Sequence, residues 1–394
     1  MINPGLVITA AIAGGYTYWR FTFRQVTAAI RLEGAGRLDE ARDLLNGFLL
    51  NPNPLTRRGE AKARGRLLLA RLERKSGRYG QAAKESLRLE NSLASPGLRL
   101  AALQVRADAL CWAGDLPAAL RLAREGLGQA RDLHLDAFLP ELEALQTRAL
   151  LWTGSFDAAT GAAEGLIRSG GVGARYGRLR LSEIERAAGR FDAAIEWAEK
   201  LASSLQVDAA QPGSRSDRMP LWESLARYHA ARAAFLREDW SDAADRLVPE
   251  NPLMPRAELV AWHGLRAATL AAIGKQNDAD RALRRLKDTA SAVPPGFGAA
   301  AWQRYYSGRA AMARGDYARA AEEIAAALQN FPPGDAIAEI WYFLGSCQEK
   351  AALGIARDAF ASGAEYPASF HFARLCKAAL NAGDSIPFIR LTAP

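Results

Sequence analysis

One short phrase recurs along the chain: a glycine, any residue, an aromatic residue or leucine, two further residues, and an alanine. Full copies begin at Gly36, Gly77, Gly114, Gly154, Gly189 and Gly315, and degenerate copies begin at Glu238 and Gly274. Successive copies are 35 to 49 residues apart. Self-similarity at such a spacing is typical of repeat proteins, in which each unit stacks on the next. The chain is therefore expected to be a solenoid that offers a binding surface rather than a catalytic pocket.

Each copy of the phrase lies between two stretches with helical periodicity. Apolar residues spaced by three and four occupy Leu98–Leu110 before Gly114 and Ala118–Leu127 after it. The glycine is expected to end the first helix, because glycine enters the left-handed conformation without steric cost. An aspartate one or two residues after the aromatic residue, as at Asp157, Asp192 and Asp242, is expected to cap or favour the first turn of the next helix. Each copy thus predicts a helical hairpin that buries its apolar face only by stacking on its neighbours.

The most complete motif lies near the C-terminus. Trp341, Leu344 and Gly345 begin one helix, Ala356 and Phe360 follow in the next, and Pro367 comes after it; Pro332 ends the preceding copy in the same way. These residues, in this order, resemble the signature of the tetratricopeptide repeat family. The resemblance implies an all-α, right-handed superhelical solenoid. About nine hairpins would occupy residues 22–367, with a closing helix and tail over 368–394. The spacing exceeds the roughly 34 residues usual in that family, so some helices or loops are expected to be longer.

The resemblance also indicates which side chains would face a partner. In that family the first helix of each hairpin lines the concave groove. Counting back from each turn gives the candidate partner-binding residues Arg64, Arg71, Arg74, Arg148, Tyr176, Arg186, Tyr228, Arg232, Trp302, Tyr305, Arg309 and Tyr342. Arginine beside aromatic residues suits an extended peptide with carboxylates. The alternative is that several of these side chains pack inside the hairpins, since a slip of one residue rotates a helix face by about 100°.

The N-terminal segment differs from the rest of the chain. Residues 2–19 carry no charge, aromatic residues gather at the end of the segment, and Arg20 and Arg24 follow. Its length is close to that of a short membrane span of roughly 17–25 residues, and the basic side is expected to stay in the cytoplasm. No lysine or arginine precedes the segment, as one would in a secretory signal. Residues 1–21 therefore predict a transmembrane anchor or, alternatively, a capping helix that packs on the first repeat or mediates homo-oligomer formation.

Positive charge is concentrated early in the repeats. The net charge is +8, and the stretch Arg57–Arg88 carries many basic residues against Glu60, Glu73 and Glu85. Three interpretations are open for this stretch. It is a solvated face with partly paired charges, a surface attracted to anionic lipid headgroups, or a binding surface for an acidic protein. Nucleic acid is a less favoured partner, because no recognised nucleic-acid module accompanies the charge.

Patterns typical of catalysis or metal binding are not found. Cys111, Cys347 and Cys376 are far apart and are expected to be small buried thiols. The four histidines lack metal-ligand spacing, and Gly170–Gly173 lacks the lysine of a phosphate-binding loop. No catalytic, cofactor-binding or metal-binding residue is therefore predicted, and the chain is not expected to be an enzyme. A long loop, or a hinge between two lobes, is expected over Ser203–Pro220.

Together these observations favour a membrane-tethered adaptor or scaffold that binds a protein or peptide, with the solenoid on the cytoplasmic side. Two alternatives remain open: a soluble, cytoplasmic regulatory receptor for a peptide, and a helper protein associated with nucleic acid.

Overall fold

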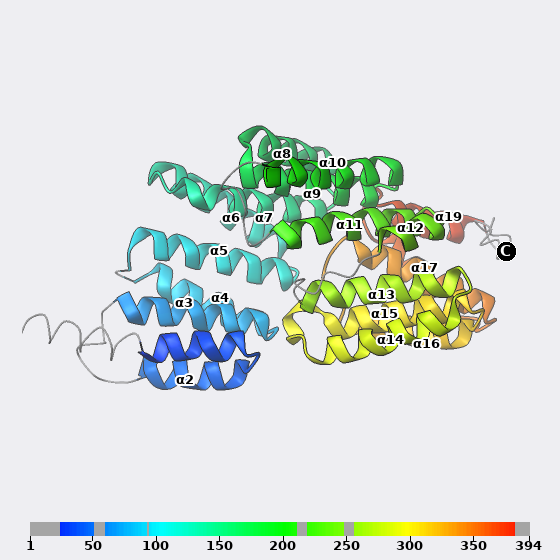
Figure 1. Ribbon diagram of the computed structural model, residues 1–394, viewed down its shortest axis with the longest axis horizontal. Helices are drawn as coiled ribbons and strands as arrows, with labels where there is room; N and C mark the ends of the chain where they lie inside the picture. Colours follow the sequence, from blue (N-terminus) through cyan, green and yellow to red (C-terminus); the bar gives the residue numbers. More distant parts are fainter. Residues whose placement is uncertain (1–23, 51–59, 93, 211–218, 248–255, 383–394) are drawn as a thin grey trace, which may run out of the picture. The chain divides into compact units, whose positions relative to one another are not determined.

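The computed structural model describes residues 24–50, 60–92, 94–210, 219–247 and 256–382 (Figure 1). Within these ranges the regular structure consists of α-helices and two short 3-10 helices, without a strand. The all-α class expected from the sequence is confirmed. The uncharged segment 2–19 and the expected tail after Asp384 lie outside the described residues.

The chain divides into two compact units, residues 1–139 and residues 140–394. The division falls inside the single array expected over 22–367.

Unit 1 is a stack of helical hairpins. It contains a helical segment over residues 24–34, α2 (Leu38–Leu50), α3 (Glu60–Lys75), α4 (Tyr79–Glu90), α5 (Pro96–Trp112), α6 (Leu116–Asp132) and a 3-10 turn, η1 (Asp136–Phe138). The first helices α3 and α5 pack against each other, and α4 packs against both (Figure 1). Leu45, Phe48, Leu69 and Leu72 are buried between the hairpins, which therefore share one apolar core.

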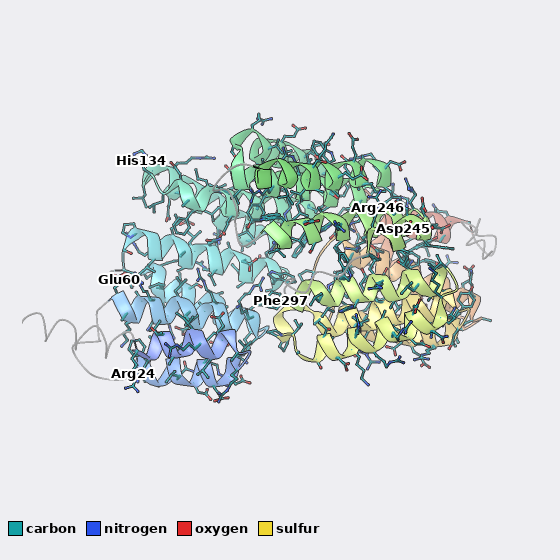
Figure 2. The ribbon with its side chains drawn as sticks, in the orientation of Figure 1. Arg24, Glu60, His134, Asp245, Arg246 and Phe297 are labelled. Carbon is teal, nitrogen blue, oxygen red and sulfur yellow. The ribbon has the colours of Figure 1, made fainter. Side chains whose placement is uncertain are left out.

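Unit 2 continues the same pattern. Its elements are α7 (Leu139–Trp152), α8 (Phe156–Ser169), α9 (Gly171–Ala187), α10 (Phe191–Ala210), α11 (Met219–Leu236), α12 (Trp240–Arg246), α13 (Arg256–Ala272), α14 (Gln276–Ser291), η2 (Pro295–Phe297), α15 (Ala299–Ala313), α16 (Tyr317–Leu328), α17 (Ala336–Lys350), α18 (Ala356–Ala364) and α19 (His371–Asn381). First helices of successive hairpins pack side by side, as α9 does on α11 and α13 on α15. Figure 2 labels Arg246, the last residue of α12, and Phe297, the last residue of η2.

The recurring phrase forms the corner of each hairpin, as expected. At Gly77 the backbone has a φ of 75°, and Arg78 donates its backbone N–H to the carbonyl of Glu73 at 2.9 Å. This pattern closes the last turn of a helix in the Schellman arrangement. The degenerate copy keeps the same geometry without glycine, because Glu238 has a φ of 68°. The turn geometry is therefore retained even where the sequence motif is not.

The structure bears on two local expectations. Asp157 and Asp192 lie in the first turn of their helices, which is one of the two roles expected for them. The side-chain caps come instead from the residue before the aromatic residue or leucine, since Asp115 and Asp316 accept from backbone N–H groups at 3.2 Å. The loop expected from Ser203 is partly helical, since α10 continues to Ala210. Buried Leu201 and Leu205 keep the helix packed over this stretch. Residues 211–218 of that loop lie outside the described ranges.

Candidate functional site

Arginine and tyrosine side chains of unit 2 converge on one buried carboxylate. Glu339 of α17 is 2% exposed. Tyr305 of α15 donates a hydrogen bond to its Oε1, and Arg232 of α11 donates from Nη2 to its Oε2 at 3.0 Å. Arg186 of α9 places its Nη1 4.0 Å from the same Oε2. One carboxylate thus connects four first helices across the inner side of unit 2.

Further contacts fix this cluster from several sides. Arg186 also donates from Nη2 to Oδ2 of Asp335 at 2.6 Å. The guanidinium of Arg232 lies 5.1 Å from the centroid of the Trp302 ring. Burial by itself lowers the pKa of Arg232, but Glu339 raises it well above the ordinary value. The cluster is therefore a permanently charged network with its acceptors inside the protein.

A second buried ion pair lies nearby on α9 and α11. Glu183 pairs with Arg180, and its Oε1 is 3.7 Å from Nε2 of His229. Burial alone would raise the pKa of Glu183, but Arg180 and the neighbouring cations lower it to about 2. Burial lowers the pKa of His229 to about 4, against the attraction of Glu183. His229 is therefore neutral at physiological pH, and the expectation of a structural histidine fits this position.

The C-terminal segment closes unit 2 on its own first hairpins. Ser369 donates to the backbone carbonyl of Gly154 at 2.8 Å, although 215 residues separate them. Arg374 donates from Nη2 to the carbonyl of Ala188 at 2.9 Å, and His371 packs directly against the turn at Gly189. The C-terminal segment thus packs on the corners of the first two hairpins of unit 2.

The structure brings part of the predicted groove together. Six of the candidate residues share the cluster described above or adjoin it: Arg186, Tyr228, Arg232, Trp302, Tyr305 and Arg309. Their partners there are groups of unit 2 itself, which is the internal packing considered as an alternative in the sequence. Whether any of them contacts a partner protein remains a prediction.

Three other candidates in unit 2 pack separately from the cluster. Arg148 lies over its helix neighbour Trp152 at 5.8 Å. Tyr176 meets the Trp222 ring at 4.9 Å, and Tyr342 packs with the aromatic residues of α17 to α19. These side chains support adjacent helices, and the structure does not bring them into one surface.

The acidic members of the cluster were missed in the sequence. Glu339 and Asp335 lie at the start of the hairpin that carries the family signature, and Glu183 lies in the middle of α9. The available signal was a carboxylate inside an otherwise apolar first helix, which predicts a buried charge with a partner. The residues next to each carboxylate in the sequence do not indicate which side chain pairs with it.

In unit 1, unlike in the cluster of unit 2, candidate arginines on a first helix are exposed. Arg64 and Arg71 of α3 are exposed, and Arg64 pairs with Glu60 (labelled in Figure 2) one turn earlier. Arg74 is partly exposed. It donates from Nε to Asp108 of α5 at 2.7 Å and lies 5.1 Å from the centroid of the Trp112 ring. These side chains form a polar and aromatic surface on α3 and α5, called here the α3–α5 face.

Much of the basic stretch Arg57–Arg88 is paired. Ion pairs join Arg66 and Arg88 to Glu85, Lys75 to Glu33, Arg78 to Glu73, and Arg74 to Asp108. These partners neutralise a large part of the positive charge. The interpretation as a solvated, paired face therefore describes most of this stretch.

The cysteines, possible metal ligands and possible membrane-spanning helices are the remaining features considered from the sequence. The three cysteines are buried thiols, as expected, and burial raises the pKa of Cys347 to about 12. Within the described ranges, no group of three histidine, cysteine or acidic side chains could hold a metal ion. No helix in the described part of the chain is long and apolar enough to cross a membrane.

Comparison with known proteins adds one resemblance. No family model matches the chain, and no curated protein matches it. Among the solved structures, it is similar to a tetratricopeptide repeat protein from Parabacteroides merdae, with 13% identity, a TM-score of 0.45, and coverage of 83% of this chain and 98% of that chain. At this sequence identity and TM-score, the similarity carries no argument about function.

Proposed function

We propose that the chain is an adaptor that binds a segment of another protein on the α3–α5 face of unit 1. The observation that carries the proposal is the contrast between the units. The first-helix arginines Arg186 and Arg232 of unit 2 are buried against the chain's own carboxylates, whereas Arg64 and Arg71 of unit 1 are exposed. Arg71 has no ion-pair partner in the described part of the chain. The α3–α5 face therefore retains guanidinium donors for an external carboxylate.

The chemistry of this face suits an acidic segment with an apolar anchor. Arginine binds a carboxylate through two parallel hydrogen bonds. Trp112 is half-buried beside Arg74 and offers a rigid aromatic surface, the residue type that contributes most often to binding energy at interfaces. A partner segment with acidic residues flanking one apolar side chain would satisfy both features.

Reversing the exposed charges tests this surface. The double variant Arg64→Glu with Arg71→Glu is expected to weaken partner capture at least tenfold, because like charges repel an acidic segment. Capture is measured by crosslinking and quantitative pull-down, followed by titration of the purified partner. The matched control is Arg121→Glu with Arg124→Glu, which makes the same charge change on exposed positions of the second helix α6. Equal capture by both double variants would exclude the α3–α5 face.

We also propose that residues 2–19 tether the chain to a membrane. It is supported by the sequence of residues 2–19, which is uncharged and ends in aromatic residues followed by arginines. We expect the full chain to stay with membranes after high-salt and alkaline washing and to be released by detergent, while a chain lacking residues 2–19 stays in the supernatant. If the full chain is released without detergent, the soluble peptide receptor is the better description.

A further inference from the structure

A cavity of ≈300 Å³ lies at the corner ends of three hairpins in unit 2, against the helix α17. It is bounded by the ends of α11, α13 and α15, the starts of α12 and α16, and the middle of α17. Its apolar lining comes mainly from Phe235, Leu236, Trp240, Met312 and Phe343. A concave, mostly apolar cavity with a few polar groups is the usual form of a small-molecule site, and this volume is at the small end of that class.

One buried cation lines this cavity. Arg309 is 7% exposed, and its guanidinium lies 3.6 Å from the centroid of the Phe343 ring and 4.7 Å from that of Phe235. Its Nη1 donates to Oη of Tyr305 at 2.8 Å. Within the described residues no carboxylate lies within ion-pair distance of Arg309, and its Nε and Nη2 have no hydrogen-bond partner. Neither atom belongs to the fully enclosed unpaired atoms of the structure, so both reach accessible space.

Charge in the neighbourhood does not neutralise this arginine. Tyr305 donates its own hydrogen to Glu339, and the charge of Glu339 is compensated by Arg232. The acidic side chain that lines the cavity, Glu238, makes no ion pair in the described part of the chain. Burial raises the pKa of Glu238, while Arg309 and Lys350 act against that shift. Arg309 thus lacks a carboxylate at ion-pair distance, with Glu238 acting on it only from further away, in an apolar environment where a cation is costly without a paired anion.

We propose that this cavity binds a small organic monocarboxylate with an aryl or alkyl body. The carboxylate accepts hydrogen bonds from Nε and Nη2 of Arg309, which present the fork geometry that matches two carboxylate oxygens. The body packs against Phe235, Trp240 and Phe343. A single negative charge is required, because Arg309 is the lining arginine that has no carboxylate partner among the described residues, whereas Arg314 is paired with Asp280, and Glu238 repels a second charge. The site is separate from the α3–α5 face, so the inference stands independently of the proposed adaptor function.

The ligand class is tested by calorimetric titration of the full chain with 4-phenylbutyrate and octanoate. The matched probe is 4-phenylbutyramide, which has the same body without the charge. We expect both acids to bind and the amide to bind at least tenfold more weakly. Equal affinity for acid and amide, or binding of neither acid, would overturn the proposal. So would binding confined to peptides with an apolar carboxy-terminal residue, because the occupant would then be a protein terminus.

Variants locate the ligand without disturbing the charged cluster. Ala313→Trp changes an exposed residue of the cavity rim and should reduce affinity for 4-phenylbutyrate at least tenfold, with an unchanged circular dichroism spectrum. Ala325→Trp, at an exposed position of α16 outside the cavity, is the control and should leave affinity unchanged. Glu238→Gln removes the competing carboxylate and should strengthen binding severalfold. Retained affinity in Ala313→Trp would place the ligand elsewhere and refute the site.

Discussion

Replacing Glu339 by glutamine is expected to lower the free energy of unfolding of unit 2 by about 3–5 kcal/mol, the usual cost of breaking a buried ion pair from one side. Glu339 is the shared acceptor of Tyr305, Arg232 and Arg186. The neutral amide cannot balance the two guanidinium charges, which remain buried. Denaturant unfolding followed by circular dichroism and by tryptophan fluorescence measures the loss.

A matched substitution separates this effect from a general loss of charge. Glu223 of α11 pairs with Arg227 one turn later, and both side chains are largely exposed. Glu223→Gln is therefore expected to cost no more than about 1 kcal/mol. Adding Arg232→Met to Glu339→Gln should recover part of the loss, because one unpaired cation is removed. If Glu339→Gln were as mild as Glu223→Gln, the network would contribute little to the stability of unit 2.

Replacing Gly189 by alanine is expected to destabilise unit 2 by about 2–5 kcal/mol and to release its C-terminal segment. The left-handed backbone, with a φ of 83°, accounts for about 1–2 kcal/mol of this cost. The rest, about 1–3 kcal/mol, comes from overlap, because an added Cβ would run into the ring of His371. Hydrogen exchange of residues 367–381 should accelerate, since His371 belongs to the contact that closes unit 2.

Gly274→Ala provides the matched control for this prediction. Gly274 has a φ of 77° at the equivalent hairpin corner, and an added Cβ would meet nothing within 4 Å. The control should therefore show only the conformational cost, about 1–2 kcal/mol, without faster exchange at the C-terminus. Equal behaviour of the two variants would mean that the contact between His371 and the Gly189 turn does not hold the segment in place.

The closure of unit 2 also bears on function. A partner peptide that bound to Arg186 and Arg232 would have to displace Asp335 and Glu339, to which their guanidinium groups already donate hydrogen bonds. On the α3–α5 face of unit 1, the exposed Arg71 can be reached without breaking an ion pair of the described residues. This difference is the reason to place the proposed protein partner on unit 1 and a small anion in the cavity beside Arg309.

The hairpins and their corners were predictable because their causes are local. A glycine followed by an aromatic residue and an alanine specifies a helix end, a corner and a close helix contact within six residues. The family signature near the C-terminus has a similar explanation. An added Cβ at Gly345 would lie 2.7 Å from the ring of Phe360, so the glycine is needed for that ring to pack.

The candidate site was predictable only in part. Helical periodicity correctly placed Arg186, Arg232 and Tyr305 on first helices that meet, but it assigned them to an open groove. Their partner Glu339 is 107 residues from Arg232, and Asp335 is 149 residues from Arg186. No spacing rule within one repeat connects such distant residues.

By itself, therefore, the sequence determined the repeating hairpin, the handed turn at each corner and the all-α class, because these depend on interactions within a few residues. Only the tertiary structure decided that unit 2 closes on its own C-terminal segment and that its inner arginines pair with its own carboxylates. The physical reason is that each hairpin is rotated slightly relative to the last, and the sum of these rotations determines which distant residues meet.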